Sequence, residues 1–333
     1  MDIAGIRQYM TLLLSAIENN SNPQIGQLIH NAYFHRHWFT VGEIHRRLQA
    51  IVRFIESSEF LNHYGRLNNS DSPCRIAFYS EENIPLEEFF SVLTLVAIGH
   101  EIQYKGPSPA DKVLRWIFED MQLQGLFRGR IHFVEDQFSA FDKLIVATRN
   151  PWPETNRRLL HQKHHTLDLC RYQSVAVIPT SLSQNFLTEL ATDIFSYFGM
   201  GCGNVRKIFI PRDFDFTLFF QAIEIWYETM FNHHSYMNNY QYYQSVYLMN
   251  RIEHRDNGFL LLKEDVQHRA PTGVLFYEYY DDDQILRQQL QKATGIYRVC
   301  VDSPTLHGEI SCGESVNQLF LPQEEIIDFV VEA

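Results

Sequence analysis

A cysteine between two glycines is the residue whose setting most favours chemistry in this sequence. Cys202 follows Gly201 and precedes Gly203, just after an apolar helical pattern. Its small neighbours leave the backbone free to wrap around a reacting atom and to aim the cysteine N–H at it. A thiolate is a strong nucleophile, and its pKa falls beside positive charge, which Arg206 and Lys207 would supply if they turned inward. The pattern therefore predicts covalent catalysis by Cys202. The alternative is that Cys202 is a small residue that fills space after a glycine at the end of a helix.

The other cysteines favour structural roles. Cys74, Cys170 and Cys300 stand in apolar or strand-like sequence, where cysteine packs as a small apolar residue, and Cys312 stands in a loop-like stretch without an assigned role. Five scattered cysteines with no C-x-x-C spacing exclude a zinc ribbon and argue against a disulfide framework. We therefore expect a reduced protein in the cytoplasm.

Length and charge narrow the class of protein further. The chain has 333 residues, with 28 basic and 40 acidic residues and a formal net charge of −12. This acidic balance argues against nucleic acid as a partner. One core stops growing at roughly 250–300 residues, so the length predicts two lobes. No segment approaches about 18 uncharged apolar residues, so we expect no membrane span.

After a helical start, short apolar strands alternate with amphipathic helices. This alternation is typical of βαβ units around a parallel sheet, as in nucleotide-binding lobes. The expected strands cover residues 74–79, 100–105, 130–135, 142–148 and 174–179. Helices are expected between these strands, at 86–98, 110–122 and 153–161.

Cys202 belongs to a second predicted lobe, which begins near Gln173. A strand at 174–179, a helix at 183–198 and a strand at 205–211 place Cys202 in the turn between the helix and the second strand. A helix at 216–231 and a strand within 271–282 follow.

The prediction for the whole chain is an α/β fold in three parts. The first part, 1–172, consists of N-terminal helices and a Rossmann-like cofactor-binding sheet, and the second, 173–296, is the catalytic lobe. The third, 297–333, packs back or mediates oligomerisation. Its last residues, 324–333, are expected to form an oligomer-forming strand or a loose tail.

The sequence around Cys202, DIFSYFGMGCGNVRKIFIP, resembles the active-cysteine segment of the fatty acyl-CoA reductase family of the LuxC type, a branch of the aldehyde dehydrogenase superfamily. Other similar runs follow in the order of that family: WFTVGEIHRRLQAI, ENIPLEEFFSVLTLVAIGHEIQYK, FDKLIVAT, QSVAVI, HHSYMNNYQYYQSVYLMN, DNGFLLLKED and APTGVLFYEYYDD. The resemblance covers most of residues 38–283. It implies an aldehyde-dehydrogenase-like fold with a Rossmann-like cofactor lobe.

The resemblance also implies a reaction in fatty acid metabolism. Cys202 would attack an acyl-CoA thioester, expel CoA and hold the acyl group as an enzyme thioester, which NADPH would reduce to the aldehyde. By similarity, the Asn83 side chain and the Cys202 N–H would form the oxyanion hole. Asn83 would otherwise serve as a turn residue that caps the helix beginning near Pro85. Because reduction needs no activated water, a general-base glutamate is not required.

The same resemblance implies the cofactor contacts. Lys105 resembles the superfamily lysine that contacts the adenosine ribose, and the hydroxyl of Ser108 leaves room for a 2′-phosphate, which favours NADPH. By similarity, Glu264 would approach the nicotinamide ribose. Arg149 departs from the family: its large side chain can block the approach of the phosphates or instead contact the pyrophosphate directly. The alternative for Lys105 and Ser108 is a solvated lysine at the end of a strand, followed by a turn.

The sequence departs from the family pattern at three places in the expected active and cofactor sites. Glu82, beside Glu81, stands where the family has glycine; residues 149–151 replace a Gly-Ser pair near the phosphates; and Gly203 replaces a basic residue. These changes leave two rivals open. One is a catalytically silent or acyl-binding paralogue with a degraded dinucleotide site. The other transfers the acyl group to a partner or to water without a hydride step.

The remaining conspicuous residues have structural interpretations. His233 and His234, with Asn238 and Asn239, lack a third ligand at metal spacing, so we expect packing and hydrogen bonding there and no metal site. The basic residues 161–165 indicate a solvated helix end. For partners, the resemblance implies an acyl-CoA substrate and leaves open an acyl-supplying protein, and we expect a homo-oligomer.

Overall fold

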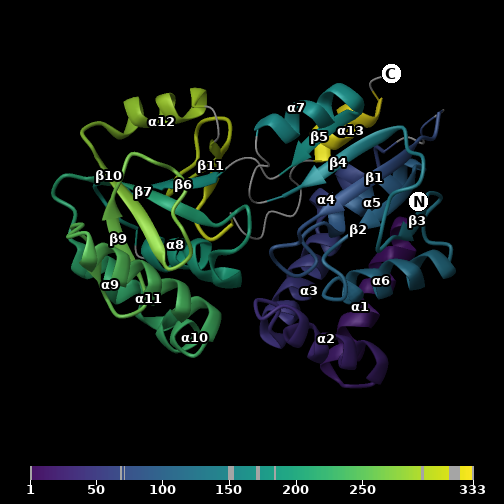
Figure 1. Cartoon of the computed structure of the whole chain (residues 1–333), viewed down its shortest axis with the longest axis horizontal. Helices are drawn as coiled ribbons and strands as arrows, with labels where there is room; N and C mark the ends of the chain where they lie inside the picture. The colour runs from purple at the N-terminus through teal and green to yellow at the C-terminus, as the bar shows by residue number, and fades with distance from the viewer. Residues whose placement is uncertain are drawn as a thin grey trace. The chain divides into compact units, whose positions relative to one another are not determined.

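A computed structural model describes residues 2–67, 70, 72–148, 154–169, 173–183, 185–293, 296–314 and 323–331. The chain divides into two compact units, which are described separately (Figure 1). Unit 1 comprises Met1–Arg171 with Leu319–Ala333, and unit 2 comprises Tyr172–Gln318. In the part of the chain that is described, no helix combines the length and the apolar character needed to span a membrane.

Unit 1 is built on a five-stranded parallel sheet. Its strand order is β3-β2-β1-β4-β5, with bounds β1 Arg75–Ser80, β2 Glu101–Lys105, β3 Arg130–Phe133, β4 Lys143–Ala147 and β5 His165–Leu169. The chain steps outward from β1 to β3 on one side and then restarts at β4 on the other. The strand order therefore reverses between β1 and β4, and crevices at such a reversal are where open α/β sheets bind ligands.

Helices cover the two faces of this sheet unequally. The larger core joins Ile76, Phe78 and Ile145 of the sheet to the helices on one face; these are α1 (Ile3–Glu18), α2 (Pro23–His35), α3 (Val41–Glu56), α4 (Ser58–Tyr64), α5 (Phe89–Ile98), α6 (Lys112–Leu123) and α13 (Gln323–Val331). A smaller core on the other face joins Ala77, Leu144 and Val146 to Leu160 of α7 (Glu154–Lys163). This distribution follows from right-handed crossovers that move in opposite directions from the centre of the sheet.

The first four helices of unit 1 begin at residues whose side chains cap them. Asp2, Asn22, Thr40 and Ser57 each accept a hydrogen bond from a backbone N–H in the first turn of α1, α2, α3 and α4. Such a bond satisfies one of the unpaired donors of a helix start and typically contributes about 1 kcal/mol. Helix α5 needs no polar face, because every one of its residues is buried.

The fifth strand of unit 1 differs from the prediction. It is β5, His165–Leu169, which was not predicted; the strand predicted at 174–179 is β6 (Gln173–Val177), in the sheet of unit 2. Polar residues within the short run HTLDL hide the strand pattern in the sequence. The strand forms in the folded protein because β5 pairs with β4 along its whole length.

The end of the chain also differs from the expected strand or loose tail. Residues Gln323–Val331 form α13, and Ile326, Phe329 and Val330 are part of the larger core of unit 1. The buried Lys143 ammonium donates hydrogen bonds to the carbonyl oxygens of Phe329, at 2.8 Å, and Val330, at 3.4 Å. A cation at a helix carboxyl end satisfies free carbonyls and complements the helix dipole. The predicted segment 297–333 is thus shared between the two units.

Unit 2 contains a seven-stranded sheet in the order β12-β11-β6-β7-β10-β9-β8. The bounds beyond β6 are β7 Val205–Pro211, β8 Arg255–Asp256, β9 Leu261–Glu264, β10 Val274–Tyr280, β11 Ile296–Val301 and β12 Glu309–Ser311. All neighbours are parallel except β8 and β9. The α/β prediction is confirmed.

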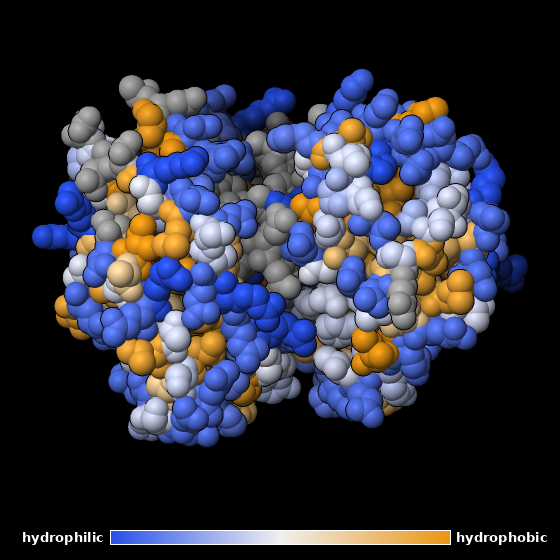
Figure 2. Space-filling view, turned by 180° about the vertical axis from the view of Figure 1, so that it is seen from behind, coloured by the Kyte–Doolittle hydropathy of each residue, from blue (hydrophilic) through white to orange (hydrophobic). Residues whose placement is uncertain are grey.

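Helices lie on both sides of this second sheet (Figure 1). Helix α12 (Asp283–Lys292) packs on one side through Leu290, and α8 (Phe186–Phe195) and α11 (His234–Met249) lie on the other. The predicted helix 216–231 is broken into α9 (Phe216–Ile223), a short 3₁₀ turn and α10 (Tyr227–Phe231). Figure 2 shows one face, on which hydrophilic side chains predominate and apolar ones occur in separate groups.

Candidate active site

The loop that carries Cys202 is held by one buried asparagine. The Asn204 side-chain oxygen accepts a hydrogen bond from the Gly201 N–H at 2.7 Å. Its amide nitrogen donates to the carbonyl oxygens of Asp193 at 2.8 Å and Ser196 at 3.0 Å. Asn204 is 1% exposed, so water cannot replace these bonds. The loop before β7 is therefore tied directly to the end of α8.

The chain between α8 and this loop has unusual backbone geometry. Tyr197, Phe198 and Gly199 have φ values of 52°, 57° and 68°, so three successive residues are left-handed. For residues other than glycine this conformation costs about 1 kcal/mol or more each. The Phe198 ring stacks on His233 with 3.9 Å between ring centroids. The surrounding packing thus holds a sharp reversal that places Cys202 before the amino end of β7.

Arg269 is a positive charge that interacts with Cys202. Burial lowers the pKa of Arg269, and electrostatic interaction with Cys202 opposes this decrease. Arg206 instead donates to the carbonyl oxygens of Ala270, at 2.8 Å, and Gly199. Lys207 is paired with Glu278, with 2.5 Å between Nζ and Oε2. The residues next to Cys202 in the sequence therefore do not identify the cation that interacts with it, because Arg269 lies in the segment that leads into β10.

Asn83 lies in unit 1, in the turn that follows β1. Its backbone N–H donates to Glu87 Oε2 at 2.7 Å, and Ile84 N–H approaches the same oxygen at 3.4 Å. Arg36 Nη1 donates to the carbonyl oxygen of Glu81 at 2.5 Å. The turn is therefore anchored on both sides of Asn83.

Glu82, which precedes Asn83, points into the interior of unit 1. The residue is 1% exposed and has a left-handed φ of 37°. Tyr104 donates a hydrogen bond to Glu82 Oε1 at 3.0 Å. Burial raises the pKa of Glu82 well above its ordinary value, and the nearby Asp111 carboxylate adds to the rise. Burial therefore favours the protonated form of Glu82 and reduces the negative charge that its sequence position next to Glu81 suggests.

Two further buried carboxyl groups surround Glu82. Burial and the Glu87 carboxylate raise the pKa of Glu88 from 4.5 to about 8. Burial also raises the pKa of Asp111, whose Oδ1 has no hydrogen-bond partner. Sequence reasoning does not identify these two residues, because only the fold brings them to Glu82.

The predicted cofactor residues are placed in different parts of the fold. Lys105 ends β2, and its Nζ donates to the carbonyl oxygen of Asp136 at 2.5 Å. Ser108 is exposed in the turn between β2 and α6. Arg149 lies outside the described residues. Cys170 also lies outside them. Glu264 ends β9 in unit 2 and is exposed. In the sheet it pairs with Tyr277 of β10, which pairs with Ile208 in the middle of β7.

His233 has two structural contacts in unit 2. Besides stacking on Phe198, its Nδ1 accepts a hydrogen bond from the Tyr236 N–H at 3.1 Å and so caps α11. Over the ranges that the structure describes, no group of three or more His, Cys, Asp or Glu residues could hold a metal ion. His233 therefore acts as a packing and capping residue.

Comparison with known proteins identifies the fold. Neither the known protein families nor the curated proteins include a match to the sequence. Among solved structures, a betaine aldehyde dehydrogenase from Staphylococcus aureus in complex with NAD⁺ matches with a TM-score of 0.61 and 11% identity, over 92% of this chain and 76% of that chain. A succinic semialdehyde dehydrogenase from Streptococcus pyogenes with NADP⁺ matches with a TM-score of 0.59 and 9% identity, over 99% and 79%.

A third match is a mutant of aldehyde dehydrogenase C from Pseudomonas syringae, in complex with NAD⁺ and octanal. Its TM-score is 0.55 and its identity 11%, over 92% of this chain and 78% of that chain. The chain therefore has the aldehyde dehydrogenase fold. At such low identity the likeness defines the fold and not the reaction, which has to be argued from the site.

Proposed function

We propose that this chain reduces a fatty acyl-CoA thioester to the aldehyde with NADPH, using Cys202 as its nucleophile. The observation that carries the proposal is the preformed loop at Cys202, which Asn204 ties to α8 and which has Arg269 as its associated positive charge. A cation favours the thiolate form of cysteine, and a fixed loop lowers the cost of orienting it. The resemblance of residues 193–211 to the LuxC-type active-cysteine segment supports the same reaction.

The proposed chemistry begins at the Cys202 sulfur. The thiolate attacks the acyl carbonyl carbon, a new C–S bond forms, and the bond to CoA breaks as CoA leaves as a thiolate. The Cys202 N–H donates a hydrogen bond to the oxyanion, worth about 3–4 kcal/mol in the transition state. When bound, the reduced nicotinamide supplies the hydride that converts the enzyme thioester to the aldehyde. Release of the aldehyde restores the Cys202 thiolate for the next cycle.

Unit 1 fits a nicotinamide dinucleotide at the carboxyl ends of its strands. Asn83 follows β1, Lys105 ends β2 and Thr148 follows β4, so an amide, an ammonium and a hydroxyl group lie along one edge of the sheet. Dinucleotides bind at this edge in open parallel sheets. The buried Glu82 carboxyl favours its uncharged form, so it does not repel the phosphates. The NAD⁺ and NADP⁺ complexes of the structural neighbours support this choice of cofactor.

An aliphatic substrate is supported by one of those neighbours. The aldehyde dehydrogenase C structure contains octanal, a linear aliphatic aldehyde. Octanoyl-CoA is therefore a suitable first probe for the reaction proposed here.

Trapping the acyl-enzyme tests the proposal. The purified chain is mixed with octanoyl-CoA and analysed by intact-protein mass spectrometry, and NADPH is then added while the aldehyde is measured by gas chromatography. We expect one octanoyl group on Cys202, its loss on addition of NADPH, and a matching amount of octanal. Cys312→Ser is the matched control, because Cys312 is a buried cysteine of the same unit. Labelling without aldehyde would instead indicate acyl transfer, and no labelling would reject Cys202 as the nucleophile.

Cofactor preference provides a separate test at Ser108. A carboxylate there would pair with a ribose 2′-hydroxyl and repel a 2′-phosphate. We expect Ser108→Asp to weaken NADPH binding by about tenfold or more and to favour NADH, measured by fluorescence titration. Ser15→Asp, an exposed change on α1, is the control. Absence of NADPH and NADH binding by the parent chain would favour a silent paralogue.

A further inference from the structure

A pocket between α1 and α6 in unit 1 takes no part in the proposed reaction. Its volume is about 450 Å³, within the range of roughly 300–1,000 Å³ that is usual for small-molecule sites. The walls are fixed by close contacts at the start of α1. The Asp2 N–H donates to the carbonyl oxygen of Leu126 at 2.9 Å, and a Cβ on Gly5 would lie 2.8 Å from the Leu126 side chain.

The pocket lies away from the edge where unit 1 would bind a dinucleotide. Helix α6 connects the carboxyl end of β2 to the amino end of β3. Trp116, Asp120 and Gln124 of the pocket come from the middle of α6 or from just beyond its end. The pocket therefore faces toward the amino ends of the strands, whereas dinucleotides bind at their carboxyl ends.

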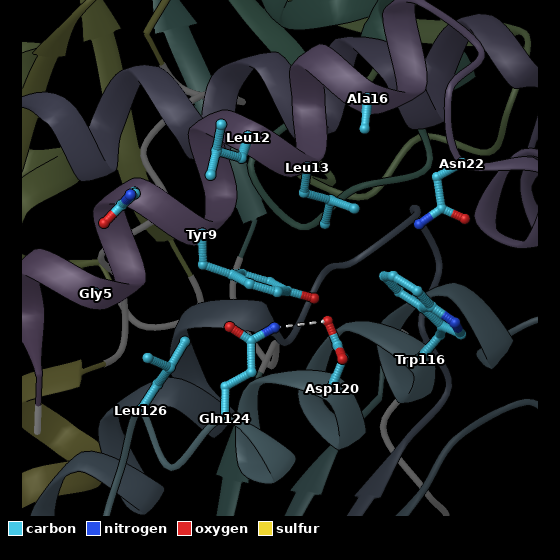
Figure 3. Close-up of a pocket in the computed structure, with 11 residues that line it drawn as sticks. Gly5, Tyr9, Leu12, Leu13, Ala16, Asn22, Trp116, Asp120, Gln124 and Leu126 are labelled. Carbon is cyan, nitrogen blue, oxygen red and sulfur yellow. Dashed lines mark hydrogen bonds between the residues drawn. The ribbon is translucent and has the colours of Figure 1, made fainter.

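A buried hydroxyl group points into this pocket. The Tyr9 ring extends from α1 toward Asp120 on α6 (Figure 3). Tyr9 is 9% exposed, and its hydroxyl lies next to the Asp120 carboxylate but does not form a complete hydrogen bond with it. Burial and the nearby Asp120 carboxylate raise the pKa of Tyr9, so the hydroxyl keeps its proton. An unsatisfied buried hydroxyl is costly, and a ligand with a suitable polar group would remove that cost.

The charge of the pocket is negative and has no counter-ion within the described chain. Asp120 Oδ2 accepts a hydrogen bond from Gln124 Nε2 at 3.1 Å (Figure 3). Among the residues whose placement is described, no salt bridge includes Asp120, and none of the lining residues is Lys, Arg or His. The apolar part of the lining includes Leu13, Ala16 and Trp116. A carboxylate beside apolar and aromatic groups attracts a cation that carries an apolar body.

We propose that this pocket binds a small organic ammonium ion with an apolar or aromatic body. The ammonium N–H groups donate to the Asp120 carboxylate and to the Tyr9 oxygen, and the Tyr9 O–H remains free to donate to Asp120. The body of the ligand packs against Leu13 and Trp116, and the Trp116 ring adds a cation–π attraction. Neutral analogues bind less tightly because they lack the charge-assisted bond, and carboxylates are repelled.

Calorimetric titration of the whole chain at low ionic strength tests this proposal. The probes are benzylammonium, its neutral analogue benzyl alcohol, and benzoate. We expect saturable binding of benzylammonium, binding of benzyl alcohol at least about tenfold weaker, and no binding of benzoate. Asp120→Asn should weaken benzylammonium binding at least about tenfold. Glu119→Gln, an exposed neighbour on α6 outside the lining, should leave it unchanged.

A second variant keeps the proposal testable if Asp120→Asn does not fold. Ala16→Phe fills the pocket from α1 and leaves Asp120 in place, so it should abolish binding. Retained binding in Ala16→Phe, equal affinity for benzyl alcohol, or absence of saturable benzylammonium binding by the parent chain would each overturn the proposal. None of these outcomes depends on Cys202 or on the proposed reduction.

Discussion

The turn that carries Cys202 and the turn that follows β1 both contain left-handed backbone, but they are held by different chemistry. In unit 2, neutral hydrogen bonds of the Asn204 amide hold the loop. In unit 1, the buried carboxyl groups of Glu82 and Glu88 pack behind the turn, and burial raises the pKa of both. The hydrogen bonds of Asn204 in the first turn include no titratable side chain. The second is most stable while its carboxyl groups keep their protons.

The largest effect is expected at the nucleophile. Cys202→Ser replaces a thiolate by a poorly nucleophilic hydroxyl, so acyl-CoA reduction should fall by at least ~10³-fold, measured as kcat/KM. Thermal unfolding should change little, because serine has nearly the same shape as cysteine and the hydrogen bonds of Asn204 to the loop remain. Turnover at the parent rate would reject the assignment of Cys202.

Asn204→Ala should have the next largest effect. It leaves the Gly201 N–H and the Asp193 and Ser196 carbonyl oxygens without this partner, so we expect a loss of about 2–3 kcal/mol in the free energy of unfolding. Denaturant titration measures this loss, and kcat should fall with it because the nucleophile is less well positioned.

Asn204→Asp serves as the companion variant. It keeps an oxygen that can accept from the Gly201 N–H but removes both donors to the carbonyls. An intermediate loss is expected. If Asn204→Ala retained both stability and turnover, the loop would not depend on this side chain.

The pH dependence of unit 1 is tested by Glu88→Gln. The pKa of Glu88 is raised from 4.5 to about 8, so the folded state holds this proton more tightly than the unfolded state. Its contribution to stability is complete below the unfolded pKa and is lost as the pH rises through that window. Glutamine cannot titrate, so the fall in the urea midpoint between about pH 5 and pH 8 should become shallower. Glu119→Gln is the exposed control, and an unchanged slope in Glu88→Gln would contradict the assignment.

The smallest effect is expected for Glu82→Gln. A protonated carboxyl and a carboxamide have nearly the same shape, and both accept the hydrogen bond from Tyr104. Near pH 6 the free energy of unfolding should therefore change by less than about 1 kcal/mol. A much larger change would indicate that Glu82 is ionised in the folded protein and interacts as a charge.

Three strands of unit 1 were predictable from short runs in which apolar residues are continuous or alternate with polar ones. The predictions 74–79, 100–105 and 142–148 correspond to β1, β2 and β4 within one or two residues at each end. The pattern of β5 was not predictable, since its polar residues break the apolar run. Helix α13 was not predictable as packed structure either, because its last carbonyls depend on Lys143 from β4.

The site was predictable in part. The two glycines mark Cys202 as a candidate nucleophile, and residues 193–211 carry the resemblance to a known active-cysteine segment. Arg269 was not identified, because an arginine far along the chain has no local pattern that relates it to Cys202. The roles of Asn83, Lys105, Ser108, Arg149 and Glu264 stay predictions.

The sequence by itself determined the α/β class and the cysteine on which the proposed chemistry rests. These features depend on residue type and short-range spacing, which the chain carries before it folds. Only the tertiary structure decided that Glu82 and Glu88 favour their protonated forms, that Asn204 holds the Cys202 loop, and that Tyr9 and Asp120 share a pocket. Burial, pKa and hydrogen-bond partners are set by residues distant in sequence, so they exist only once the chain has folded.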